Sequence, residues 1–100
     1  MHFNQLQEKI IKNAKSYGKR FKIEISQEFA ILKLFEELGE LAEAVLTHDQ
    51  KSRPEKTLTP AKAKEKVAAE LADVLGMTIV LANIFEIDLE KALQNKWIKE

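Results

Sequence analysis

Two stretches decide the fold of this chain: EELGELAEAV at residues 36–45 and AAELADVLGM at residues 68–77. Each places carboxylates three residues apart, Glu37 with Glu40 and Glu70 with Asp73, and Glu36 precedes the first pair. The surrounding leucine, alanine and valine indicate apolar helices, on which residues three apart are neighbours. Because like charges repel when two such helices meet, the pattern calls for a hard divalent cation between them.

Helical spacing of apolar residues continues outward from both stretches and predicts an all-α protein. We expect helices over residues 3–17, 26–47, 60–84 and 88–100. Ser26, Thr59 and Asp88 are the expected N-caps, and Pro60 suits the first position of the third helix. A polar segment at residues 48–60 carries both prolines and is the expected loop between the two long helices.

These elements predict a four-helix, bundle-like fold with two long antiparallel central helices, forming one domain over residues 1–100. A softer break is expected around Gly18, where we end the first helix. The second half of the third helix is apolar almost all round, so it needs burial on several sides. In so small a chain this indicates a subunit interface and therefore a homo-oligomer.

Composition narrows the class of function. The formal net charge is zero and aromatic residues make up 7% of the chain, which argues against a nucleic-acid-binding surface. The absence of cysteine excludes disulfides and thiolate metal sites. No secretory segment and no apolar run of about 20 residues is apparent, so we expect a cytoplasmic protein without a membrane span.

Basic residues gather in two blocks, at residues 8–22 and 51–66. They are either solvated helix faces or cations that reach a phosphate group held by a metal.

Antiparallel packing of the two long helices would bring the four carboxylates Glu37, Glu40, Glu70 and Asp73 to one spot. Such oxygen ligands favour Mg²⁺, with Mn²⁺ as the alternative, whereas a set without histidine or cysteine disfavours zinc. The competing interpretation is solvent-exposed carboxylates paired with lysines. A metal ion here would neutralise phosphate charge and activate a water molecule, and a carboxylate free of the metal would orient that water.

Gly39 and Gly76 lie within or close to the two stretches. A glycine inside a helix costs about 1 kcal/mol relative to alanine, so each position needs a reason. Close approach of another helix and room for a ligand beside the metal are both consistent with the sequence.

The two acidic motifs, Glu36-Glu37-Leu38-Gly39-Glu40 and Glu70-Leu71-Ala72-Asp73, resemble those of the MazG-like, all-α nucleoside triphosphate pyrophosphatase superfamily. Their surroundings are similar as well, in ELGELAEAV, AAELADVLGMTIVLA and the final IDLEKALQNK. The resemblance covers about residues 26–99. The segment between the two motifs, with 29 residues, is at the long end of the family's range.

The resemblance implies an Mg²⁺-dependent hydrolase that cleaves a nucleoside triphosphate between its α- and β-phosphates. It implies homodimers, or homotetramers built from dimers. The metal ligands would be Glu37, Glu40, Glu70 and Asp73. Glu36 would be an additional ligand or a water-orienting group, so the expected catalytic residues are Glu36 and Glu40.

The substrate-binding half of the site is less complete. Many members carry a lysine, an asparagine and an arginine near their C-terminus; Lys96 matches the lysine, and Glu100 stands where the asparagine would be. Lys96, Lys99 or a basic loop residue is expected to bind phosphate. Phe21, Phe29 and Trp97 are candidates for stacking on the base, with a place in the core as the alternative.

Two other functions are consistent with the same resemblance. One is a phosphoribosyl-ATP pyrophosphatase-like enzyme, which shares the metal motif. The other is a helical nucleotide-binding or interaction module that keeps the fold without catalysis.

Overall fold

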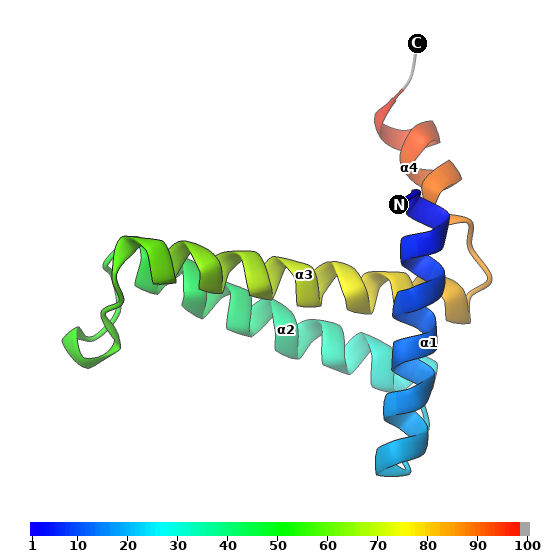
Figure 1. Ribbon diagram of the computed structural model, residues 1–100, viewed down its shortest axis with the longest axis horizontal. Coiled ribbons are helices and arrows are strands. Elements are labelled where there is room, and N and C mark those ends of the chain that lie inside the picture. Colours follow the sequence, from blue (N-terminus) through cyan, green and yellow to red (C-terminus); the bar gives the residue numbers. More distant parts are fainter. Residues whose placement is uncertain (99–100) are drawn as a thin grey trace.

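A computed structural model describes residues 1–98 and consists of α-helices joined by short connections (Figure 1). The helices are α1 (Phe3–Phe21), α2 (Gln27–His48), α3 (Pro60–Ile84) and α4 (Leu89–Trp97), with a 3₁₀ turn, η1 (Pro54–Lys56), between α2 and α3. No strand occurs within these residues. The predicted all-α class is therefore confirmed.

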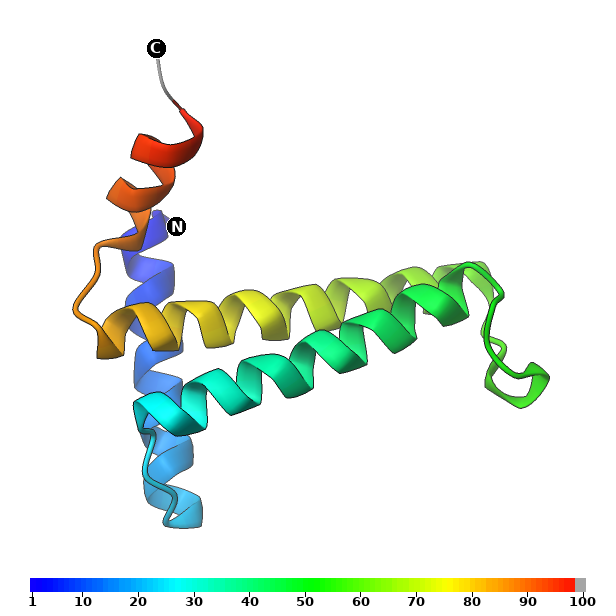
Figure 2. The ribbon, with the colours of Figure 1, turned by 180° about the vertical axis from the view of Figure 1, so that it is seen from behind.

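The long helices α2 and α3 form an antiparallel hairpin, and α1 crosses its open end (Figures 1 and 2). Small side chains line the contact between the two long helices: Ala30 and Ala44 on α2 and Ala63 on α3 are buried. Ile79, Val80 and Ala82 are buried near the end of α3 that α1 crosses. Small residues let the helix axes approach closely, which holds the acidic motifs of α2 and α3 face to face.

The helix starts follow the predicted caps. The Ser26 hydroxyl accepts a hydrogen bond from the Phe29 backbone N–H at 3.1 Å. Thr59 caps α3 and Asp88 caps α4 in the same way. Each cap satisfies a backbone donor that the first helical turn leaves unpaired.

The predicted end of the first helix is wrong, because α1 continues past Gly18 to Phe21. The C-cap residue is Lys22, whose backbone is left-handed at φ 55°, and the Ile23 N–H donates to the Gly18 carbonyl at 2.9 Å. A Cβ atom at Gly18 would lie 2.8 Å from the Ile23 carbonyl oxygen and 2.9 Å from Ile25 Cγ1. Gly18 therefore marks the place where the following segment folds back on the helix, not the helix end.

A single copy of the chain is open in shape. Its radius of gyration is 15.9 Å, whereas a compact chain of this length has about 13 Å. Both views place α4 to one side of the hairpin, past the N-terminal end of α1 (Figures 1 and 2).

Apolar side chains remain uncovered on the two long helices. Phe35 on α2 is 66% exposed, and Leu71 and Leu75 on α3 are also exposed. By length and composition alone α3 qualifies as a membrane-crossing helix. In the structure this helix packs along α2 and carries the buried Glu70.

Candidate metal centre

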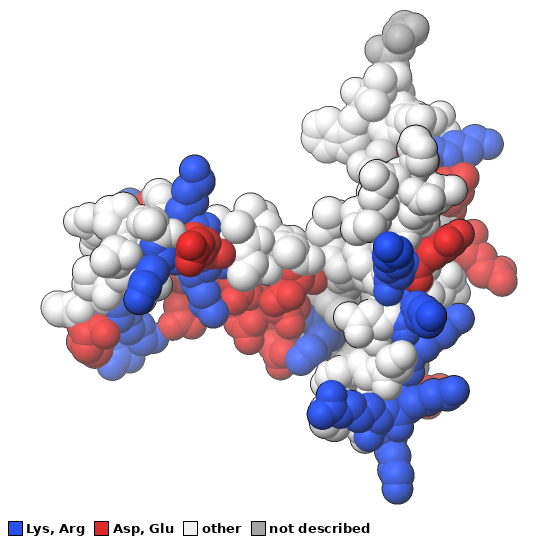
Figure 3. Space-filling model, viewed as in Figure 1, with Lys and Arg blue, Asp and Glu red and all other residues white. Residues whose placement is uncertain are grey.

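The four predicted carboxylates meet between α2 and α3. One carboxylate oxygen from each of Glu37, Glu40, Glu70 and Asp73 lies within 4.8 Å of the others. Figure 3 shows acidic side chains gathered along the middle of the hairpin, apart from the lysines and arginines on the lower half of α1. The convergence predicted from helical spacing is therefore present, because the antiparallel hairpin aligns the two motifs.

Two of these carboxylates are buried, which solvated acidic faces do not explain. Glu37 is 9% exposed and Glu70 is 4% exposed. Their Oε2 atoms have no hydrogen-bond partner among the described residues. A buried polar atom without a partner is costly, so each of these oxygens needs a ligand.

Electrostatics point in the same direction. Burial first, and then the neighbouring Glu40 and Asp73 carboxylates, together raise the pKa of Glu37 from its ordinary value of 4.5 to about 7. The Lys66 ammonium lies 3.0 Å from Glu70 Oε1. Without a cation, the negative charge of the cluster is therefore reduced by a proton on Glu37 and balanced by the ammonium group of Lys66.

The donor set fits a hard divalent cation. All four ligands are carboxylates, two of them offer buried oxygens without partners, and Glu40 and Asp73 face solvent. Mg²⁺ binds a few carboxylates and keeps other positions for water and phosphate oxygens, which suits a centre that is buried on one side and open on the other. Mn²⁺ accepts the same ligands.

Glu36 lies outside this cluster. Its Oε1 atom accepts a hydrogen bond from the Lys33 ammonium at 2.6 Å. The exposed side chain of Glu36 thus holds a lysine beside the centre.

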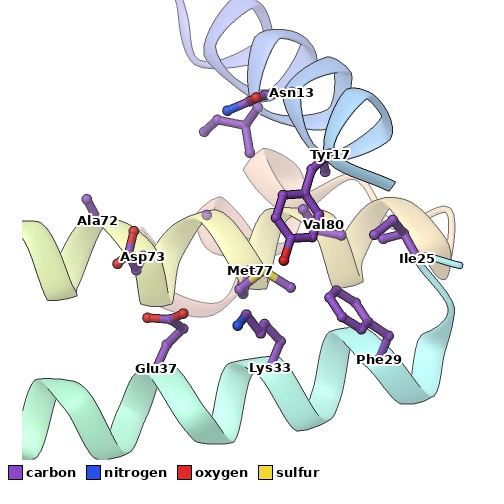
Figure 4. Close-up of a pocket in the computed structure, with 13 residues that line it drawn as sticks. Asn13, Tyr17, Ile25, Phe29, Lys33, Glu37, Ala72, Asp73, Met77 and Val80 are labelled. Atoms are coloured by element: carbon purple, nitrogen blue, oxygen red, sulfur yellow. The ribbon is translucent and has the colours of Figure 1, made fainter. Parts of the chain in front are cut away.

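A cavity of about 530 Å³ adjoins the carboxylates under α1 (Figure 4). Its apolar lining includes Ile25, Phe29, Met77 and Val80 from α2, α3 and the segment before α2, and α1 contributes Asn13 and Tyr17. Glu37 and Asp73 line both the cavity and the metal centre, and Lys33 lies next to them. This volume is within the range of small-molecule sites.

The two glycines of the acidic stretches, Gly39 and Gly76, can now be compared with the position of the cavity. Gly76 lines the cavity, and a Cβ atom at Gly39 or Gly76 would meet no atom of the described residues within 4 Å. Close helix approach inside one chain therefore explains neither glycine, and Gly76 leaves room in the cavity.

Of the residues predicted to bind the substrate, some line the cavity and others do not. Lys96 lies on α4, which supplies none of the described residues that line the cavity, and Lys99 lies outside the described residues. Phe29 lines the cavity, whereas Phe21 and Trp97 do not. Both of the latter are exposed, Trp97 by 80%, so the core interpretation is wrong for them within one chain.

Sequence reasoning missed Lys33, Asn13 and Tyr17. Lys33 had a readable signal, since it is the one lysine of α2 and stands one helical turn before Glu37. Asn13 and Tyr17 had none, because their role depends on how α1 crosses the hairpin.

Fold and site together define an all-α protein with a candidate divalent-metal centre beside a cavity in the size range of small-molecule sites. Residues 25–99 match the MazG nucleotide pyrophosphohydrolase domain, and the chain belongs to that family. It is also similar to an uncharacterized protein, YvdC, of Bacillus subtilis (strain 168). The two are 39% identical over 71 residues, which span 66% of this chain and 67% of the relative. No solved structure matches the chain.

Proposed function

We propose that this protein is an Mg²⁺-dependent nucleoside triphosphate pyrophosphohydrolase that cleaves the bond between the α- and β-phosphates. The observation that supports this proposal most directly is that the candidate metal centre and the cavity have two residues in common. Glu37 and Asp73 belong to both, so a phosphate chain on the carboxylate-bound metal would have its nucleoside beside the cavity.

The reaction needs a positioned phosphate chain and an oriented water more than covalent chemistry. The water oxygen forms a bond to the α-phosphorus, the bond from that phosphorus to the bridging oxygen breaks, and pyrophosphate leaves. The products are a nucleoside monophosphate, pyrophosphate and one proton. When bound, Mg²⁺ neutralises phosphate charge and lowers the pKa of water.

The side chains divide the remaining tasks. Glu37, Glu70 and Asp73 would hold the metal, and the exposed Glu40 would share in binding it, orient the attacking water and take its proton. Glu36 holds the Lys33 ammonium against the phosphate side of the cavity. The nucleoside occupies the cavity, where Phe29 and Met77 offer apolar surface to the base.

We also propose that the protein works as a homodimer or a dimer of dimers, as the family resemblance implies. Phe35 on α2 and Leu71 on α3 are exposed, and each is two residues from a metal-centre carboxylate. Two residues correspond to about 200° around a helix, so Phe35 lies on the side of α2 away from Glu37, and Leu71 lies on the side of α3 away from Asp73. A second copy can cover these two apolar side chains without blocking the site, which fits the open shape of one chain.

The test is a pyrophosphate-release screen over common and modified nucleoside triphosphates with Mg²⁺, using wild type and Asp73→Asn. We expect turnover by wild type and at least about a hundredfold loss in the variant, because one metal ligand becomes a neutral amide. Circular dichroism of the variant should retain the helical signal. Wild-type turnover by Asp73→Asn would contradict the proposal. Preferred turnover of phosphoribosyl-ATP would show that the protein is a phosphoribosyl-ATP pyrophosphatase-like enzyme instead.

A further inference from the structure

The charged residues of the metal centre follow a fixed order along the hairpin. Because α2 and α3 are antiparallel, increasing residue numbers on α2 run beside decreasing numbers on α3. From the end that α1 crosses, Lys33 comes first, followed by the carboxylates of the centre and then by Lys66. The cavity lies at the Lys33 end, and the connection that contains η1 lies at the Lys66 end (Figures 1 and 4).

The two lysines bracket the carboxylates in matching ways. The Lys33 ammonium contacts Glu36 Oε1 at 2.6 Å and lines the cavity. The Lys66 ammonium contacts Glu70 Oε1 at 3.0 Å, and its side chain is 57% exposed. Each ammonium is thus held beside the centre by a carboxylate, one on the enclosed side and one on the open side.

The contact between Lys66 and Glu70 would no longer be needed to balance the charge of Glu70 once a metal ion binds. Glu70 is buried, so in the free protein Lys66 supplies its counter-charge. A divalent cation bound by Glu70 would supply that charge instead. The ammonium of Lys66 would then be free to bind a phosphate oxygen of the substrate.

We propose that the substrate lies along the hairpin with its nucleoside and α-phosphate at the Lys33 end and its departing pyrophosphate at the Lys66 end. This orientation rests on the proposed pyrophosphohydrolase function. Lys66 stabilises the charge that develops on pyrophosphate as the bond breaks, and Lys33 stays with the monophosphate product. The pyrophosphate leaves through the open side, while the nucleoside end stays in the cavity.

Calorimetric binding of the two products separately tests this assignment, with inorganic pyrophosphate and a nucleoside monophosphate as probes in the presence of Mg²⁺. We expect Lys66→Gln to weaken pyrophosphate binding by about tenfold and to leave monophosphate binding within about twofold. Lys33→Gln should have the opposite preference. Lys66→Arg should bind pyrophosphate as wild type does, because the positive charge is retained.

Lys64→Gln is the matched control for Lys66→Gln. It removes the same charge from the same helix, two residues away and therefore about 200° around its axis. This variant should bind both products as wild type does. Titration of Mn²⁺ without phosphate gives a further readout: Lys66→Gln should bind the ion more tightly, because a competing cation on Glu70 is gone.

The outcomes separate the orientation from the proposed function. If wild type binds neither product with Mg²⁺, the proposed function fails. If wild type binds both products but Lys66→Gln weakens both equally, or weakens neither, only the orientation is overturned.

Discussion

Glu37 and Glu70 are carboxylates that are largely buried, at 9% and 4% exposure. The Oε2 atom of each is buried without a partner among the described residues. Burial and two neighbouring carboxylates raise the pKa of Glu37 to about 7, which means that the metal-free centre holds a proton near neutral pH. The residues most suited to bind a cation are therefore the ones that destabilise the metal-free protein.

Glu37→Gln should remove metal binding and stabilise the metal-free protein. The amide has the same shape without the buried charge, so we expect loss of metal binding and a melting temperature higher by about 4 °C or more at pH 8 in chelator. Calorimetry of the metal-free protein measures this change. Glu36→Gln, an exposed neighbour, should leave the melting temperature unchanged, and a lower melting temperature for Glu37→Gln would contradict the expectation.

The pKa of Glu37 also predicts a pH dependence. Its value is about 7 in the folded protein against an ordinary value of 4.5, so between these pH values the folded state binds more protons than the unfolded state. The free energy of unfolding contributed by Glu37 therefore falls as pH rises through this interval.

Metal binding should show the opposite trend, because the ion requires the deprotonated carboxylate. We expect Mn²⁺ affinity to increase from pH 6 to pH 8 with release of about one proton, measured by calorimetry in two buffers of different ionisation enthalpy. An affinity that is constant over this range would show that Glu37 does not lose a proton on binding.

At the scale of elements, the corner after α1 determines where the cavity forms. Gly18 lets residues 23–25 fold back against the helix, and this places Ile25 in the cavity lining while α1 supplies Asn13 and Tyr17. The hairpin alone would offer the carboxylates on an open surface. The crossing of α1 encloses one side of them.

Gly18→Ala should disturb this corner. The new methyl group would lie 2.8 Å from the Ile23 carbonyl oxygen, which is backbone and cannot move aside easily. We expect a destabilisation of about 1–3 kcal/mol in chemical denaturation. Gly76→Ala is the matched control, since its methyl group meets nothing within 4 Å, and it should gain about 0.5–1 kcal/mol from helix propensity.

At the scale of the whole molecule, one chain leaves much apolar surface uncovered. Exposed apolar residues on α2 recur at helical spacing, as Ile31, Phe35, Leu38 and Val45. A stripe of this kind on an open chain is typical of a subunit interface.

Phe35→Glu should therefore separate the subunits, because it places a charge in the middle of that stripe. We expect light scattering after size-exclusion chromatography to change from an oligomeric to a monomeric mass, with a lower melting temperature. Lys19→Glu, at an exposed position of α1, should keep the oligomeric mass. A monomeric wild-type protein would contradict the proposed assembly.

Local patterns were enough to predict much of this protein. The caps at Ser26, Thr59 and Asp88 are confirmed, since capping depends on a side chain and a backbone group three residues away. The meeting of the carboxylates was also predictable, because two helices joined by one loop have few ways to pack. The end of α1 was not, since Gly18 responds to Ile23 and Ile25, which contact it only after the chain turns.

The sequence by itself determined which segments are helical, their order and the carboxylates that converge, because these follow from spacing along a helix and from the family's motifs. Only the tertiary structure decided which carboxylates are buried, that Lys33 and Lys66 flank them, and that α1 encloses a cavity beside them. The physical reason is that burial and enclosure depend on the angle at which one helix crosses another. Periodicity within a helix carries no information about that angle.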